Sequence, residues 1–143
     1  MGEIRLKAAT RDSYGQTLLE LGRENPNIVV IGGDLNESTR TNLFAKEFPE
    51  RFFDLGPAEQ NMIGTAAGMA AAGKMPFVST FAVFGTGRPF DQLRVSVSQP
   101  HLNVKLVCTH AGIITGDDGI SAHGIEDISL ASSLIGFTVI APA

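Results

Sequence analysis

A continuous run of β-branched residues, Ile28-Val29-Val30-Ile31, is the feature that most limits how this chain can fold. A strand that is apolar at every position is buried on both faces, which is typical of an inner strand of a parallel sheet. Helices must then cover both faces of that sheet. Residues 10–23, which precede the run, carry apolar side chains at helical spacing, and Asn25-Pro26 ends that pattern.

The same alternation of strand and helix patterns continues along the chain. We predict strands at 28–31, 51–55, 75–80, 104–109 and 137–141, and helices at 10–23, 42–47, 58–72, 90–98 and 126–134. This order predicts a three-layer α/β/α domain with a mainly parallel sheet. The length suits one domain, so we expect residues 1–143 to form a single unit. A covering helix usually follows a last strand, and we therefore expect this unit to be truncated at its C-terminus.

Charge and composition exclude several classes of partner. The net charge is −4 and no cluster of Lys and Arg stands out, so neither nucleic acid nor an anionic membrane is an expected partner. No apolar run is long enough to span a bilayer, and the N-terminus lacks the hydrophobic core of a signal peptide. The only cysteine, Cys108, has no partner within the chain. Together these features predict a cytoplasmic protein.

Polar and aromatic side chains follow the predicted strands. In an open parallel sheet, ligands bind beyond the carboxyl ends of the strands. The candidates at that edge are Asp34, Ser38, Glu59, Phe81, Phe84, His110, Asp118 and His123. Each has an ordinary structural explanation when taken alone. Glu59 would favour a helix dipole, Phe81 and Phe84 would be core residues, and Asp34 and Ser38 would be turn or cap residues.

The order of these segments is more specific than any one of them. It resembles the pyrimidine-binding domain of transketolases, which are thiamine-diphosphate enzymes, and most of all the second polypeptide of split transketolases. The resemblance runs from about residue 8 to the C-terminus. The matching segments are Ala9-Thr10-Arg11, Asp34-Leu35 with Ser38, Ala58-Glu59-Gln60-Asn61-Met62, Ser79-Thr80-Phe81-Ala82-Val83-Phe84, Asp91-Gln92-Leu93-Arg94, Thr109-His110-Ala111-Gly112 and Gly116-Asp117-Asp118-Gly119. The resemblance implies the thiamine-diphosphate-binding fold of the pyrimidine type.

The resemblance also implies a set of cofactor-binding residues. Glu59 matches the glutamate that hydrogen-bonds the N1′ nitrogen of the cofactor's aminopyrimidine ring and so promotes removal of the C2 proton. Phe81 and Phe84 match aromatic residues that pack on this ring, and Asp34 matches an aspartate near the cofactor. The cofactor itself supplies a nucleophilic carbon and stabilises the carbanion that follows.

Substrate residues are implied in the same way. Arg11, Ser38 and His110 match positions that hold the phosphate of a sugar phosphate, and His110 also counts as catalytic. Arginine suits this task because its planar fork bonds phosphate oxygens in pairs. Asp118 matches an aspartate that binds a substrate hydroxyl.

The chain departs from the family pattern at three points. Gly87 stands where many relatives carry a third aromatic residue. Ala122 stands where transketolases place a second substrate histidine, and His123, one position later, is the candidate to replace it. The family's diphosphate and metal motif, a Gly-Asp-Gly followed downstream by asparagine, is absent, so we expect no metal ligands in this chain.

The function implied by the resemblance is transfer of a two-carbon ketol unit between sugar phosphates. Thiamine diphosphate would be held jointly with a diphosphate-binding partner subunit, which would carry Mg²⁺ or Ca²⁺. The isolated chain would then be inactive. Two alternatives stay open: a related enzyme of the 1-deoxyxylulose-5-phosphate synthase or 2-oxoacid dehydrogenase β type, and a non-catalytic interaction domain of the same fold.

Self-association is indicated by small residues on one predicted helix. Gly64, Gly68 and Ala71 leave one face of the helix over 58–72 nearly bare. Such a face permits close approach of another backbone, and relatives build their site across subunits. We expect a homodimer or a heterotetramer with the partner subunit. The alternative is that this face packs closely on the chain's own sheet.

Overall fold

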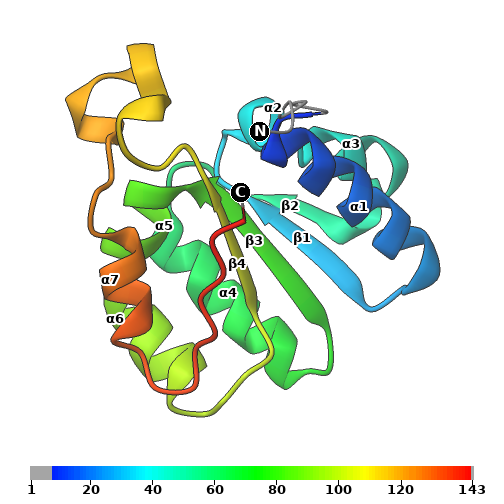
Figure 1. The fold of residues 1–143 in the computed structure, drawn as a ribbon. Coiled ribbons are helices and arrows are strands. Elements are labelled where there is room, and N and C mark those ends of the chain that lie inside the picture. The colour runs from blue at the N-terminus through cyan, green and yellow to red at the C-terminus, as the bar shows by residue number, and fades with distance from the viewer. Residues whose placement is uncertain (1–7, 143) are drawn as a thin grey trace, which may run out of the picture.

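A computed structural model describes residues 8–142 of the chain. Its sheet has four strands, β1 (Ile28–Gly32), β2 (Phe52–Asp54), β3 (Met75–Phe81) and β4 (Lys105–Thr109). They lie in the order β2-β1-β3-β4, and all three pairings are parallel (Figure 1). The predicted α/β class and parallel sheet are therefore confirmed.

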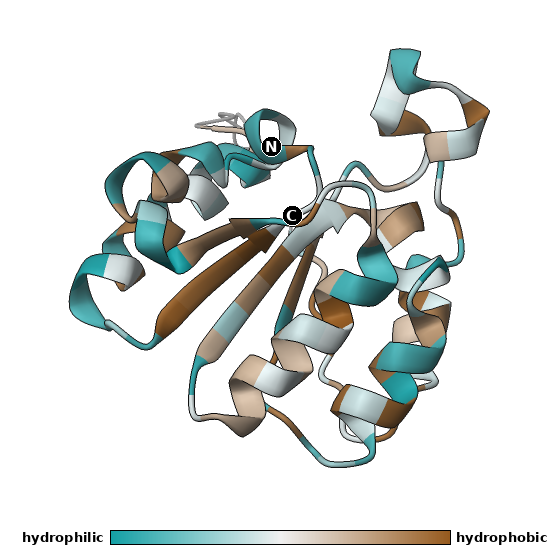
Figure 2. Cartoon of the chain, turned by 180° about the vertical axis from the view of Figure 1, so that it is seen from behind, coloured by the Kyte–Doolittle hydropathy of each residue, from teal (hydrophilic) through white to brown (hydrophobic). Residues whose placement is uncertain are grey.

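Helices pack on both faces of this sheet. One face is covered by α1 (Thr10–Glu24) and α3 (Asn42–Glu47), and the other by α4 (Glu59–Ala71) with later elements of the chain. Figure 2 shows the apolar strands in brown between helices that carry hydrophilic residues. The remaining short elements are α2 (Asn36–Thr39), η1 (Pro49–Arg51), α5 (Ala82–Gly87), α6 (Phe90–Gln92), the π-helical η2 (Leu93–Ser98), the 3₁₀ segments η3 (Gly112–Asp118) and η4 (Ile120–Ala122), and α7 (Asp127–Ser132).

The apolar run of β1 is buried at every position because its side chains alternate between two cores. Ile28 and Val30 pack with Leu18 of α1 and Phe44 of α3 on one face. Ile31 points to the other face, where its cluster is built mainly from α4, β3 and η2. The members of this cluster are Ile31, Met62, Ile63, Ala66, Ala67, Val78, Leu93, Val97 and Leu134.

The strand order places a reversal between β1 and β3. From β1 the chain passes through α2 and α3 to β2 on one side, and then through α4 to β3 on the other side of β1. Loops that leave neighbouring strands in opposite directions leave a crevice at the carboxyl ends of those strands, where α/β proteins bind ligands. Here that crevice lies between Gly33-Asp34, which follow β1, and the residues that follow β3.

The predicted strand at 137–141 is wrong. Residues 137–142 run beside β4 as an extended segment without strand pairing, and Ile140 is 79% exposed (Figure 1). A strand requires a ladder of backbone hydrogen bonds to its neighbour, and the apolar sequence alone does not supply it. The predicted helix over 90–98 is also modified, since it divides into α6 and the π-helical η2.

The small-residue face of α4 points away from the sheet. Gly64, Gly68 and Ala71 are exposed, whereas Met62 and Ile63 face the core. A Cβ atom added at Gly64 or Gly68 would meet nothing within 4 Å. This face of α4 therefore does not pack on the chain's own sheet. Among the helices of residues 8–142, none has both the length and the apolar composition needed to cross a membrane.

Candidate functional site

Three ring side chains form a stack at the carboxyl edge of the sheet. Phe81 ends β3 and is 3% exposed, Phe84 lies in α5, and His110 directly follows β4. The Phe81 and Phe84 rings are 6.0 Å apart and nearly parallel, at 11°. The His110 ring lies 4.0 Å from the Phe81 ring, at 26°. Because β3 and β4 are parallel neighbours, their ends bring residues 29 positions apart into contact.

His110 is held on both sides of its ring. Nη1 of Arg11 lies 3.2 Å from Nε2, and the hydroxyl oxygen of Thr109 lies 2.7 Å from Nδ1. A guanidinium can only donate, so Nε2 is the acceptor and Nδ1–H donates to Thr109. The ring is therefore neutral in this arrangement. Burial, together with the charge of Arg11, lowers the pKa of His110 below its ordinary value of 6.5, while Asp118 works in the opposite direction.

This geometry predicts a pH-dependent contact. The pKa of His110 is lower in the folded chain than in the unfolded chain. The neutral ring therefore contributes to stability above pH 6.5, and this contribution is lost as the pH falls through the pKa of the folded chain. We expect the His110 ring protons, followed by NMR, to titrate with a midpoint below 6.5. In Arg11→Met the midpoint should rise, because the neighbouring positive charge is gone. An unchanged midpoint in that variant would show that Arg11 does not act on the ring.

Glu59 begins α4 and is almost wholly buried, with 3% of its surface exposed. Its two carboxylate oxygens accept hydrogen bonds of 3.0 and 3.1 Å from Nη1 of Arg88. The Arg88 side chain is half-exposed, and the carbon of its guanidinium lies 4.0 Å from the centre of the Phe84 ring. Glu59 therefore connects through Arg88 to the ring stack.

The contacts of the Arg88 guanidinium show what kind of group lies between Glu59 and Phe84. It is a flat group that donates hydrogen bonds from its edge to a carboxylate and lays its face on an aromatic ring. An aminopyrimidine ring is likewise flat and forms hydrogen bonds at its edge. Glu59 and Phe84 therefore present a carboxylate and an aromatic face to the same flat group.

Asp34 lies in the loop after β1, and Asp54 organises that loop. The Asp54 carboxylate accepts hydrogen bonds of 3.0 Å from the backbone N–H groups of Asp34 and Gly56, and another from the side-chain amide of Asn36. Burial works to raise the pKa of Asp54, but these hydrogen bonds outweigh it and the pKa is lowered. Asp34 itself has φ 61°, a left-handed conformation that aspartate tolerates better than most residues.

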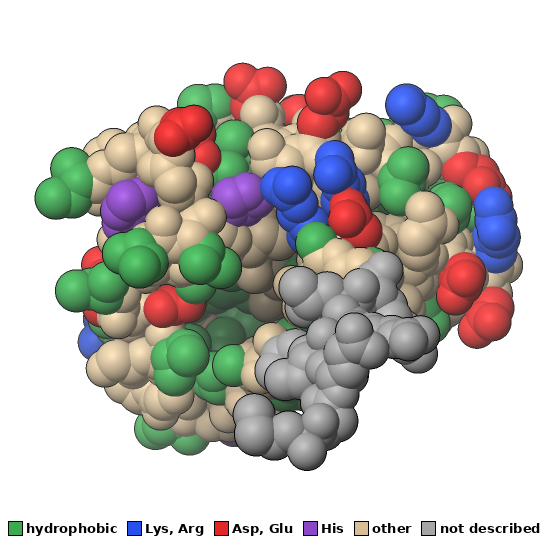
Figure 3. Space-filling model, turned by 45° about the horizontal axis from the view of Figure 1, so that its top comes forward, with side chains coloured by type: hydrophobic (Ala, Val, Ile, Leu, Met, Phe, Trp, Pro, Cys, Tyr) green, Lys and Arg blue, Asp and Glu red, His purple; other side chains and the backbone are tan. Residues whose placement is uncertain are grey.

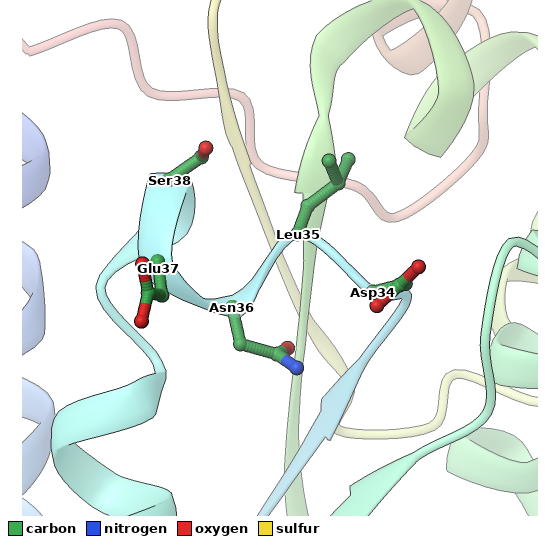
Figure 4. A pocket seen from close by; sticks show the side chains of 5 residues that line it. All are labelled: Asp34, Leu35, Asn36, Glu37 and Ser38. Carbon is green, nitrogen blue, oxygen red and sulfur yellow. The ribbon is translucent and has the colours of Figure 1, made fainter.

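A hollow of about 280 Å³ lies over this loop and α2, lined by Asp34, Leu35, Asn36, Glu37 and Ser38 (Figure 4). The Leu35 and Ser38 side chains point to the same side of the loop, and Asn36 points away from them. Ser38 is therefore carried on the same short segment as Asp34, directly after β1.

Asp118 and His123 lie on the long excursion between β4 and α7. Asp118 is exposed at the end of η3, and its charge acts on His110. Nε2 of His123 lies 3.2 Å from the carbonyl oxygen of Gly116, which can only accept, so the imidazole donates to its own loop. Ala122 is 4% exposed and faces inward. Figure 3, which looks toward the carboxyl ends of the strands, shows histidine and Lys or Arg side chains close together on this face.

Sequence reasoning missed Arg88 and Asp54. Arg88 lies in an irregular turn between α5 and α6, and no spacing rule signals that its side chain returns to Glu59. Asp54 ends β2, so the rule that ligands gather beyond strand ends would have found it as a candidate. Burial of the Cys108 thiol, followed by the charge of Asp127, raises its pKa to about 12. A thiol with such a pKa is not a nucleophile at neutral pH.

Comparison with known proteins identifies the family of the chain. The family described as "Transketolase, pyrimidine binding domain" matches residues 7–143. A Methanocaldococcus jannaschii protein described as a transketolase C-terminal section is 53% identical over 132 residues, which cover 92% of this chain and 42% of that protein. The 1-deoxy-D-xylulose-5-phosphate synthase of Desulfotalea psychrophila is 43% identical over 129 residues, covering 90% of this chain and 20% of that enzyme.

Among solved structures, a split-gene transketolase described as an inactive β4 tetramer superimposes with a TM-score of 0.75 and 54% identity, over 89% of this chain and 40% of that one. The chain thus spans less than half the length of the proteins it matches. The match and the parallel sheet define the class of the chain as an α/β domain of a transketolase type. The chain belongs to the transketolase pyrimidine-binding domain family.

Proposed function

We propose that this chain is the pyrimidine-binding part of a transketolase-like enzyme that transfers a two-carbon ketol unit between sugar phosphates. Thiamine diphosphate would bind between this domain and a diphosphate-binding partner subunit that also carries Mg²⁺ or Ca²⁺. The observation that carries the proposal is the buried Glu59 carboxylate at the start of α4, beside the Phe84 ring and bonded to a flat donor group. The similarity to transketolase sections supports the reaction class.

Each side chain of the cofactor site has a defined task in this proposal. Glu59 holds a hydrogen bond to the N1′ edge of the pyrimidine ring, and the low exposure of its carboxyl keeps water from competing for that bond. Phe81 and Phe84 supply the apolar surface on which the ring rests, worth roughly 1 kcal/mol beyond burial for each stacked pair. Asp34, fixed by Asp54, borders the same crevice.

Substrate binding is assigned to the residues around His110. Arg11 and His110 lie side by side, so the guanidinium would donate to a phosphate oxygen, and His110 would join it once Nε2 carries a proton. Ser38 would add a hydroxyl from α2, and Asp118 and His123 would face the sugar from the β4–α7 excursion. His123 has to release the Gly116 carbonyl to do so.

Complementation tests the proposal. Purified chain, thiamine diphosphate and magnesium should give no ketol transfer from a ketose phosphate to an aldose phosphate, because the diphosphate and metal motif is absent from the sequence. Addition of a diphosphate-binding subunit from the same source should give transfer. Robust turnover by the chain alone would overturn the shared-site proposal.

The same mixture distinguishes the proposed ketol transfer from its nearest alternative by the donor that it accepts. The similarity to 1-deoxy-D-xylulose-5-phosphate synthase favours that enzyme as the second candidate. If pyruvate serves as donor in place of a ketose phosphate, the chain belongs to that reaction. The Thr109-His110-Ala111-Gly112 segment, with His110 bonded to Arg11, favours the ketose donor.

We also propose that the exposed small-residue face of α4 forms a subunit interface. Gly68→Glu places a charged side chain where the chain itself leaves open space, so the fold should be retained. Self-association, measured by sedimentation, should weaken by about tenfold or more because the introduced carboxylates meet across the contact. Thr17→Glu, on the exposed side of α1, is the matched control and should change nothing. Equal sedimentation of all three proteins would contradict this interface.

A further inference from the structure

Arg88 contacts two of the three side chains that the proposed function assigns to the cofactor's pyrimidine ring, Glu59 and Phe84. Its Nη1 is bonded to both oxygens of Glu59, and its guanidinium lies on Phe84. We propose that Arg88 is an internal competitor of the cofactor: its guanidinium occupies the pyrimidine site in the free chain and must leave Glu59 and Phe84 before the ring binds. This inference rests on the proposed function, since it takes Glu59 and Phe84 as the pyrimidine's contacts.

The two partners of this ion pair differ sharply in exposure. The Arg88 side chain is 50% exposed, whereas that of Glu59 is 3% exposed. Arg88 can therefore move into water at little cost, because a guanidinium at the surface is readily hydrated. The buried Glu59 side chain cannot reach water in this way, and its carboxylate loses its positively charged partner when Arg88 leaves. A buried carboxylate without a donor is costly, so departure of Arg88 is favoured only when the incoming ring shares a proton with Glu59 at N1′.

The backbone around Arg88 is placed to let the side chain move alone. The Arg88 carbonyl oxygen accepts a 3.3 Å hydrogen bond from the side-chain amide of Gln60, which ties this turn to the start of α4. Gly87 precedes Arg88, and a Cβ atom there would meet nothing within 4 Å. The space beside the turn is therefore open, and the guanidinium can leave the Phe84 face without displacing α5.

Competition of this kind has a measurable consequence. When only a fraction of molecules have an open site, the apparent dissociation constant rises by the inverse of that fraction. A guanidinium that is in place in about nine molecules out of ten weakens pyrimidine binding by about tenfold. Removing the guanidinium should therefore strengthen binding. A residue that only positioned Glu59 for the ring would have the opposite effect, because its removal would weaken binding.

The test measures binding of 4-amino-5-hydroxymethyl-2-methylpyrimidine, the pyrimidine half of the cofactor, to the full chain by NMR titration. Arg88→Met should bind it about tenfold more tightly than the unmodified chain. In the unmodified chain, saturation with the pyrimidine should shift the Arg88 Nε–H signal toward the position of a free arginine. Arg94→Met is the matched control, since Arg94 is an exposed arginine paired with Asp91 on the same stretch, and it should leave the affinity unchanged.

Arg88→Lys covers the case in which the methionine variant does not fold. A lysine keeps a positive charge near Glu59 but places no flat group on Phe84. The Arg88→Lys variant should therefore also bind the pyrimidine more tightly than the unmodified chain does. Equal or weaker binding in the folded variants would overturn the competition while leaving the cofactor assignment intact. No binding to any variant would count against the proposed function, and the competition would fall with it.

Discussion

Replacing Phe44 with alanine is expected to lower the free energy of unfolding by about 3–5 kcal/mol. Phe44 is fully buried at 0% exposure and joins α3 to the core formed with Leu18 and β1. Its ring lies 5.0 Å from that of Phe48, and a Cβ atom added at Gly22 of α1 would come within 2.5 Å of it. The alanine variant leaves a cavity between α1 and α3 that rigid neighbours close only in part.

The loss is large against a total stability of about 5–15 kcal/mol for a domain. Urea unfolding followed by circular dichroism measures it. Leu21→Ala is the control, because Leu21 lies on α1 but is 37% exposed, and its cost should be below about 1 kcal/mol. Similar losses in both variants would mean that α3 does not anchor α1, the helix that carries Arg11.

In the proposed complex with a diphosphate-binding subunit, Glu59→Gln is expected to reduce ketol transfer by about 10²–10⁴-fold, the range of a lost proton-transfer partner. The amide has nearly the size of the carboxyl, so packing around this buried side chain should change little. It cannot exchange a proton with a ring nitrogen as a carboxyl does. The rate of transfer, measured with saturating cofactor, reports this loss.

A purely structural role for Glu59 predicts a different result. A carboxylate that only favours the helix dipole contributes roughly 0.3–1 kcal/mol of stability and no activity. Glu20→Gln, which removes an exposed carboxylate from α1, is the matched control and should retain full transfer. Full transfer by Glu59→Gln as well would support the structural role.

Much of the fold could be predicted because the core imposes a strict pattern. The run at Ile28–Ile31 is buried on both faces, and this burial is what an unbroken apolar strand signals. The apolar segment at 137–141 has a similar composition but forms no ladder with β4. Composition indicates whether a segment tends to be buried. Strand pairing also requires the edge of a neighbouring strand that is aligned with the segment.

The site was predictable to the extent that it follows strand ends. Phe81, Phe84 and His110 come together because parallel strands end at one edge. The link from Arg11 to His110 joins residues 99 positions apart, and only the family resemblance placed both near one phosphate. Arg88 was not predictable, because its side chain crosses from an irregular turn and no periodicity governs its direction.

Hydrogen–deuterium exchange at the cofactor's C2 atom tests the central proposal, that Glu59 is the partner of the pyrimidine, more directly than turnover does. It is measured by NMR after acid quench, on the chain assembled with the proposed diphosphate-binding subunit and thiamine diphosphate. We predict fast exchange in the unmodified complex and exchange slowed by about 10²-fold or more in Glu59→Gln. Exchange at the unmodified rate in the glutamine variant would contradict it.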